Sequence, residues 1–254
     1  MTFARHLLRA VGWLALVVVL LLAGPVLTLA FGGASMRGDW RTATHHATGL
    51  APDAAAHPEA IVQVYASRTF GWRGAFAVHT WVAAKPAGAL RYTRYEVIGW
   101  RAMGGRSALS ISDDVAPDAE WYGAAPTVIR ELRGPEAEAV IARLPAAAAS
   151  YPYATRYSAW PGPNSNTFTA WVGRAVPELR LKLPSTAIGK DFLPGAIADT
   201  TPSGTGVQLS LFGLTGLAVG WDEGIEVNLL TLNFGLEVKP PALKLPLIGR
   251  IGPS

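Results

Sequence analysis

The sequence contains no cysteine. This absence excludes disulfide bonds, thiolate nucleophiles and cysteine-ligated metal sites, and it is compatible with an oxidising compartment. Charged residues are also few, at 16% of the chain, and the net charge is +4 with no run of five or six like charges. Because the basic residues are scattered, we expect no nucleic-acid partner. Half of the residues are hydrophobic, so the chain is neither disordered nor a solvated coiled coil.

Several catalytic and ligand-binding motifs are also missing. There is no Ser-x-x-Lys, no Gly-x-Ser-x-Gly and no phosphate-binding loop, since Gly189-Lys190-Asp191 lacks the earlier glycine and the following Ser or Thr. Adjacent His45 and His46 point apart in a strand or helix and rarely chelate a metal alone. The aspartates between residues 113 and 118 lack the spacing of a calcium loop. We therefore expect no cofactor and no metal.

A long apolar run is present near the N-terminus. Residues 1–10 carry Arg5 and Arg9, and residues 11–31 contain no charge. As a helix these 21 residues span about 31 Å, which is enough to cross a bilayer core. We predict a cytoplasmic segment at 1–10 and a transmembrane anchor at 11–31, so that the lipid bilayer is a partner. Thr28-Leu29-Ala30 leaves a cleaved signal peptide as the alternative.

The rest of the chain is predicted to be a linker followed by one domain. Residues 32–58 are rich in Gly, Ala, Thr and Pro without a sustained period, and we expect a tether there. Residues 59–254 are expected to form a single α+β domain, in which a small antiparallel sheet packs on helices. Because a long domain translocates largely regardless of its charge, we place it outside the cytoplasm on a single-pass inner-membrane anchor.

Composition and periodicity predict the elements of this domain. Short β-branched runs predict strands, a Pro start with a Gly stop predicts a helix, and apolar residues at i, i+3, i+4 and i+7 predict a buried helix. The predicted strands are 60–68, 75–85 and 91–100; the predicted helices are 126–134, 135–144 and 167–176. Two apolar segments around Asp222-Glu223-Gly224 predict a C-terminal β-hairpin that is covered on both faces or lies against lipid.

One strand histidine is a candidate functional residue. If the Pro86–Ala89 turn is the whole loop between the second and third strands, His79 lies directly opposite Glu96 on one face. A loop longer by one residue places Tyr95 opposite His79 instead. Either partner can orient an imidazole, and Glu96 also stabilises its charged form. The alternative is a structural histidine inside the core.

Ser165 is the second candidate. Asn164, Ser165 and Asn166 are all good helix N-caps, and one cap is sufficient. A helix N-terminus also stabilises a developing anion, so a serine there with a histidine nearby has the parts for acyl transfer. Capping and nucleophilic catalysis both remain open for Ser165.

The order of these residues carries a resemblance. His79 on a strand, a polar residue on the next strand and then Asn164-Ser165-Asn166-Thr167-Phe168 at a helix start resemble the circularly permuted papain-like hydrolases. That branch includes lecithin–retinol acyltransferase-like proteins and relatives of bacterial cell-wall peptidases. The resemblance implies a permuted papain-like core with Ser165 at the position of the catalytic cysteine. A hydroxyl is a poorer nucleophile than a thiol, so either a serine variant or a catalytically silent relative is implied.

The whole chain also resembles an uncharacterised family of bacterial membrane-anchored proteins marked by the stretch from "YPY" through "WPGPNSNTF" to "AIGKDF". Two functions follow from the residues together with the papain-like resemblance. The first is a non-catalytic envelope module whose cleft binds a peptide, glycan or lipid. The second is an acyl-transfer enzyme, amidase or esterase. The predicted catalytic residues are Ser165, His79, Glu96 and Tyr95, and the predicted binding residues are Asn164, Asn166, Trp81 and Trp160.

Overall fold

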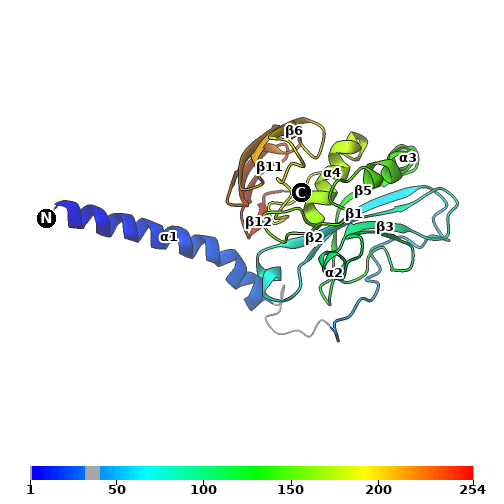
Figure 1. The fold of residues 1–254 in the computed structure, drawn as a ribbon, viewed down its shortest axis with the longest axis horizontal. Coiled ribbons are helices and arrows are strands. Elements are labelled where there is room, and N and C mark those ends of the chain that lie inside the picture. The colour runs from blue at the N-terminus through cyan, green and yellow to red at the C-terminus, as the bar shows by residue number, and fades with distance from the viewer. Residues whose placement is uncertain (1, 32–40, 254) are drawn as a thin grey trace.

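The computed structural model describes residues 2–31 and 41–253, and Figure 1 shows a long helix projecting from a folded body. This helix, α1 (Thr2–Ala30), contains the segment Ala4–Ala30, which is long and apolar enough to cross a membrane. Only 11% of its most apolar window is buried. A candidate membrane helix is therefore present where the sequence predicted one, and it also takes in the residues before the predicted span.

The body contains two antiparallel sheets. The first has the strand order β4-β3-β2-β1-β5, and its strands pair only with antiparallel neighbours. Its strands are β1 (Ile61–Arg68), β2 (Val78–Lys85), β3 (Thr93–Val97), β4 (Leu109–Ser112) and β5 (Thr127–Arg133). The three predicted strands are thus present, and the second and third form the expected hairpin.

The predicted helix at 126–134 is wrong, because this stretch forms β5. The segment pairs with the free edge of β1, from Ile61 opposite Arg133 to Ala66 opposite Thr127. A starting proline and a closing glycine suited a helix, yet the β-branched residues between them also suit a strand. Pairing with an open sheet edge satisfies the backbone groups of both strands and overrides the local preference.

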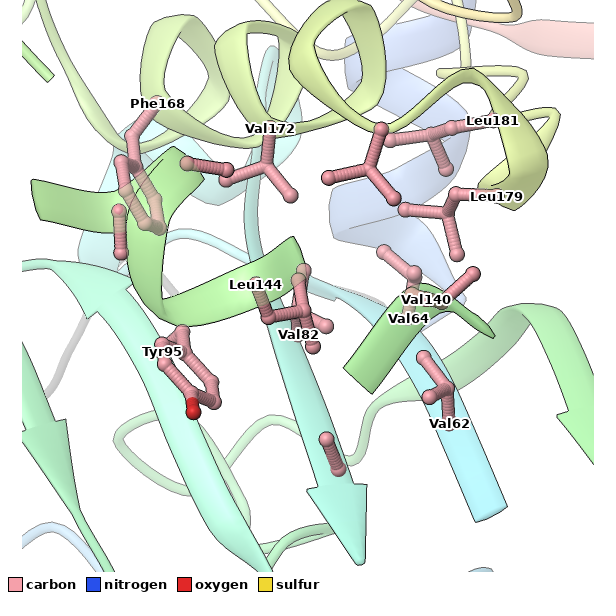
Figure 2. Packing of buried hydrophobic residues seen from close by; sticks show 14 of the residues in the cluster. Val62, Val64, Val82, Tyr95, Val140, Leu144, Phe168, Val172, Leu179 and Leu181 are labelled. Carbon is pink, nitrogen blue, oxygen red and sulfur yellow. The ribbon is translucent and has the colours of Figure 1, made fainter. Parts of the chain in front are cut away.

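Helices cover one face of this sheet. The helical elements of the body are the 3-10 helix η1 (Gly71–Ala75), α2 (Gly99–Met103), α3 (Pro135–Ala149), α4 (Ser165–Ala175) and the 3-10 helix η2 (Pro177–Leu179). Helix α3 packs on β1 and β5, and α4 packs on β2 and β3. Figure 2 shows Phe168 and Val172 of α4 in the core that also contains Val82 and Tyr95 from the strands. The helices predicted at 135–144 and 167–176 are therefore confirmed as α3 and α4.

Irregular chain covers the opposite face of the first sheet. Residues 41–58 run across it beside residues 113–125, and Ala47 and Ala119 form an isolated β-bridge. The backbone N–H of Leu50 donates to a carboxylate oxygen of Asp118 at 2.7 Å, and the Tyr92 hydroxyl donates to the carbonyl of Pro52 at 3.0 Å. The predicted tether at 32–58 lies partly outside the described residues, and the part that is described packs on the domain.

The second sheet is a seven-stranded meander in the order β12-β11-β10-β9-β8-β7-β6, much larger than the predicted hairpin. The predicted turn at Asp222–Gly224 joins two of its strands. The strands are β6 (Ala198–Thr200), β7 (Gly206–Leu211), β8 (Thr215–Gly220), β9 (Gly224–Leu229), β10 (Leu232–Val238), β11 (Pro241–Leu245) and β12 (Gly249–Ile251). This sheet packs on the side of α4 that faces away from the first sheet (Figure 1), where Arg174 donates to Gln208 at 2.5 Å.

Polar and apolar side chains alternate along the strands of the second sheet, but in the opposite sense to a surface sheet of a soluble protein. The side chains that face α4 are mostly polar or charged and are buried, whereas the side chains on the other face are apolar and exposed. We call this outward surface the apolar sheet face. Its side chains, each more than one third exposed, are Val207, Leu209, Leu211, Leu217, Val219, Ile225, Val227, Leu229, Phe234, Leu236, Val238, Leu243 and Ile251.

Candidate functional site

The N-terminus of α4 is held by a dense hydrogen-bond network centred on Asn164. Its Oδ1 accepts from the backbone N–H groups of Asn166 and Thr167 at 3.0 and 3.1 Å, and the Thr167 hydroxyl accepts from the Asn164 backbone at 3.1 Å in a reciprocal capping box. The Nδ2 of Asn164 donates to the carbonyls of Ala159 and Ile188. Asn164 is therefore the N-cap, and Ser165 is the first residue of the helix.

Asn166 attaches the same helix end to the first sheet. Its Nδ2 donates to the carbonyl of Val78 at 2.9 Å, and its Oδ1 accepts from the Thr80 hydroxyl at 2.9 Å. The Thr80 hydroxyl also lies 2.9 Å from that of Thr169, one turn further along α4. Both asparagines are buried and fully engaged, so their amides serve to position the helix.

Ser165 itself is only 4% exposed. Its carbonyl accepts from the Thr169 hydroxyl at 3.1 Å, but its own hydroxyl makes no hydrogen bond within residues 2–31 and 41–253. A serine nucleophile needs a base within hydrogen-bond reach, about 2.6–3.2 Å. The described chain provides no such base for Ser165.

His79 belongs to a second buried cluster. Its Nε2 lies 3.0 Å from Oε2 of Glu96, and the guanidinium of Arg94 forms an ion pair with the same carboxylate at 2.9 Å. The imidazole stacks on Trp121 with ring centroids 3.6 Å apart, and Arg94 lies 4.1 Å above the ring of Trp81. His79, Arg94 and Glu96 are each at most 5% exposed. We call these residues the His79 cluster.

The predicted neighbourhood of His79 and Glu96 is confirmed, but the predicted register is wrong. The strands pair Val82 with Tyr95 and Ala83 with Arg94. Continued along the strands, this register places Glu96 across from Trp81, two residues from the expected partner. A shift of two residues keeps Glu96 on the face of His79, so the carboxylate reaches the imidazole diagonally.

Burial and the neighbouring charges together set the protonation state of this cluster. Burial lowers the pKa of His79, and the adjacent Arg94 charge lowers it further, while Glu96 opposes both effects. Burial alone would raise the pKa of Glu96, but hydrogen bonds and charge from His79 and Arg94 outweigh it and hold the pKa below its ordinary value. The site therefore holds a neutral imidazole beside an Arg94–Glu96 ion pair.

The first sheet separates the His79 cluster from the start of α4. Successive side chains of a strand point to opposite faces. Thr80 points to α4, where it contacts Asn166, so the neighbouring His79 points to the other face. Tyr95 packs in the core on the α4 side, and the diagonal partner of His79 is therefore Glu96 rather than Tyr95. The structure does not bring Ser165 and His79 together.

Of the four predicted binding residues, Trp160 is the exposed one. It is 54% exposed, and its ring N–H donates to the Thr231 hydroxyl at 2.9 Å. Trp81 is fully buried beneath Arg94. Among the described residues, no three His, Asp or Glu side chains gather in a metal-binding arrangement.

The comparisons with known proteins identify a family. The family described as "Protein of unknown function (DUF3750)" matches residues 59–192, more than half of the chain. The chain belongs to this family. No curated protein and no solved structure matches it. The DUF3750 region takes in the first sheet, α3, α4 and the loop that follows α4, and the second sheet lies beyond it.

A buried ionic network joins the DUF3750 region to the second sheet. Lys190 of the region forms an ion pair with Glu226 of β9, which also pairs with Lys244 of β11 at 2.6 Å. Lys244 pairs in turn with Glu237 at 3.0 Å. Asp191 accepts from Gln208 and Asn233 at 2.6 and 2.8 Å. The side chains of all these charged residues are at most 5% exposed.

Sequence reasoning missed this network and most of the His79 cluster. Arg94 could have been found, because it lies two residues before Glu96 on the same strand and so shares its face. Trp121 comes from a loop without periodicity, and no local pattern pointed to its place over His79. Lys190 and Asp191 were considered only in the search for a phosphate loop and as part of the "AIGKDF" stretch. Their partners on the second sheet lie 17 to 42 residues away, so no local pattern pointed to them.

Proposed function

We propose that the protein is a membrane-anchored, non-catalytic binding module of the cell envelope. Anchoring is supported by α1, whose apolar segment projects from the body with its side chains uncovered. The non-catalytic part rests on one observation: Ser165 and His79 lie on opposite sides of the first sheet. Acyl transfer requires proton transfer between nucleophile and base, and a layer of backbone separates the two.

The proposed topology follows from the charge around α1. Arg5 and Arg9 precede the apolar span and suit a cytoplasmic N-terminus, and a long following domain translocates largely regardless of its own charge. We therefore place the N-terminus in the cytoplasm and the folded domain outside it, at the inner membrane. A peptide, glycan or lipid of the envelope is the ligand class that this location supplies.

A serine-directed activity probe tests the non-catalytic assignment. The full chain, reconstituted in phospholipid vesicles, is treated with a fluorophosphonate, and the labelled residue is located by mass spectrometry. We expect no label on Ser165, with the Ser165→Ala variant indistinguishable from the parent. Labelling that disappears in both Ser165→Ala and His79→Ala would instead establish a serine-dependent acyl-transfer enzyme and overturn the proposal.

A further inference from the structure

The side chains of the apolar sheet face remain exposed to solvent in the folded chain. An antiparallel sheet at the surface of a soluble domain normally buries its apolar side chains and exposes its polar ones. Here the buried side carries Glu226, Glu237 and Lys244, and the outward side carries leucine, valine, isoleucine and phenylalanine. Apolar-out and polar-in alternation is the pattern of strands that face lipid.

We propose that the apolar sheet face docks on the outer leaflet of the bilayer that α1 spans, as a second membrane contact of the same chain. This inference rests on the proposed anchoring and adds the partner of the second sheet, namely the acyl chains and headgroups of that bilayer. In Figure 1 α1 projects from the body on the side where β6, β11 and β12 lie, and α4 lies on the other side of these strands. The apolar sheet face is thus turned toward the side on which the membrane lies.

Direct contact joins α1 to the second sheet. Within residues 4–30 of α1 the buried residues are Gly24 and Pro25, and a Cβ placed on Gly24 would lie 2.6 Å from Cγ1 of Ile248 in the turn between β11 and β12. This turn continues into Ile251 and Leu243 of the apolar sheet face. The exposed apolar side chains of α1 and those of the sheet therefore meet at one place.

The position of this contact along α1 indicates how deep the β11–β12 turn lies in the bilayer. The charge-free residues 11–31 span about 31 Å as a helix, which matches the hydrocarbon core of a bilayer, about 30 Å. Gly24 precedes Phe31 by seven residues, or about 10 Å of helix. If residues 11–31 fill the core, the β11–β12 turn lies about 10 Å inside it, within the range at which interfacial elements insert, about 5–10 Å.

The hairpin turns at the same end of the sheet are apolar. Phe212 lies in the β7–β8 turn and Leu230 in the β9–β10 turn, and they are 76% and 68% exposed. Both adopt positive φ angles, 55° and 52°, where glycine, asparagine or aspartate is strongly preferred in hairpins. Large apolar residues at these positions combine backbone strain with exposure to water, and contact of the turns with lipid would account for the exposure.

The other end of the sheet has the composition of a membrane interface. Trp221 in the β8–β9 turn is 68% exposed, and the Lys239 ammonium lies 5.4 Å from its ring centroid. Tryptophan prefers the headgroup level, and a lysine near the surface is attracted to anionic lipids. The sheet is therefore inclined, with Phe212 and Leu230 deepest and the Trp221–Lys239 end among the headgroups.

The lack of cysteine makes a direct test available. Single cysteines are introduced into the full chain at Leu230, at Leu20 of α1 and at Leu90 in the loop between β2 and β3, and each is labelled with the environment-sensitive fluorophore NBD. Leu20 and Leu90 are 59% and 75% exposed, comparable to Leu230. The proteins are reconstituted in phosphatidylethanolamine–phosphatidylglycerol vesicles with or without lipids that carry a nitroxide quencher on the acyl chain.

The expected result is loss of emission by acyl-chain nitroxides for Leu230→Cys and Leu20→Cys, with no loss for Leu90→Cys. Quenching at position 20 without quenching at position 230 would overturn the docking while leaving the anchor intact. Energy transfer between copies at position 230, without lipid quenching, would overturn it in favour of a second copy of the chain. Absence of quenching at both positions would overturn the anchor as well.

Discussion

Asn164 is the residue whose hydrogen bonds fix the start of α4. Replacing it with alanine removes the acceptor of two backbone N–H groups and the donor to two carbonyls. We expect Asn164→Ala to lower the free energy of unfolding by about 1–2 kcal/mol, the usual cost of losing a cap. Chemical denaturation of the full chain in detergent measures this change.

Ser165→Ala is the matched control, because the Ser165 hydroxyl makes no hydrogen bond within the described chain. We expect its free energy of unfolding to stay within about 0.5 kcal/mol of the parent, as is usual for a substitution that removes no contact. A larger loss for Ser165→Ala than for Asn164→Ala would mean that Ser165 carries the cap.

Acid should destabilise the protein through the His79 cluster. The folded-state pKa of His79 lies below its ordinary value of 6.5, so the unfolded chain binds the proton first and stability falls as pH drops below about 6.5. The folded-state pKa of Glu96 also lies below its ordinary value of 4.5, so its contribution is present above that pH and is lost as pH falls through the folded value. Both groups act in the same direction.

The measurement is the free energy of unfolding against pH for the parent and for His79→Gln. We expect the His79→Gln profile to be flatter between pH 6.5 and 4.5, where the parent loses the contribution of a neutral, buried imidazole. Parallel profiles over this interval would show that His79 titrates with an unperturbed pKa.

At the scale of single residues, the sequence predicted which side chains lie close together better than it predicted which face of a strand a helix covers. The alternation of strands placed Glu96 beside His79, and the polar residues from 164 to 166 predicted a capped helix start. The face on which α4 packs could not be predicted, because every residue of β2 is buried. A strand covered on both sides has no polar face to distinguish one layer from the other.

At the scale of secondary-structure elements, the stability of the second sheet depends on charged side chains that are buried on its own strands. Lys244 is the shared partner of Glu226 and Glu237. Removing one member of a buried ionic group leaves an uncompensated charge, at a cost of about 3–5 kcal/mol. We expect Lys244→Met to lower the free energy of unfolding by an amount in this range, measured by chemical denaturation.

Lys239→Met provides the control, because Lys239 is exposed in the adjacent β10–β11 turn. We expect a change near zero for it, and partial recovery when Lys244→Met is combined with Glu226→Gln, which removes one of the stranded carboxylates. Equal effects of Lys244→Met and Lys239→Met would show that the network contributes nothing to attachment of the sheet.

Periodicity was a good guide to α3 and α4, whose sequences mark the buried face, and short β-branched runs were a good guide to the first three strands. It failed for β5, whose end residues satisfy helix rules while its edge position decides the outcome. It also gave only one hairpin of the second sheet. Positive-φ residues divide the two long apolar segments into four strands, Phe212-Gly213 in the first segment and Leu230-Thr231 in the second. The turn at Leu230-Thr231 lacks the asparagine or glycine that usually marks a hairpin.

For the molecule as a whole, the proposed topology predicts where each end of the chain lies. A reporter enzyme that is active only outside the cytoplasm, fused after Ser254, should be active in cells, because the domain follows a charge-free span preceded by Arg5 and Arg9. The mature protein should retain Met1, which mass spectrometry of the purified full chain determines.

Activity of a cytoplasm-specific reporter fused after Ser254 would instead show the reverse of the proposed orientation. A mature chain that starts near Phe31 would replace the anchor by a cleaved signal peptide, and it would leave the domain without α1.

The α+β class was predictable from composition and alternation. The two-sheet arrangement was not, because it depends on charged residues of β9–β11 that pair inside the body.

The inverted alternation of the second sheet has a consequence for how the protein reaches its native state. A contiguous apolar surface of this kind invites aggregation while it is exposed to water. In the proposed topology α1 holds the emerging domain beside the bilayer, so docking would be an intramolecular event whose effective concentration is set by the tether and not by the abundance of the protein. On this proposal the anchor would also limit aggregation during biogenesis, because the sheet would contact lipid before it contacts another copy of the chain.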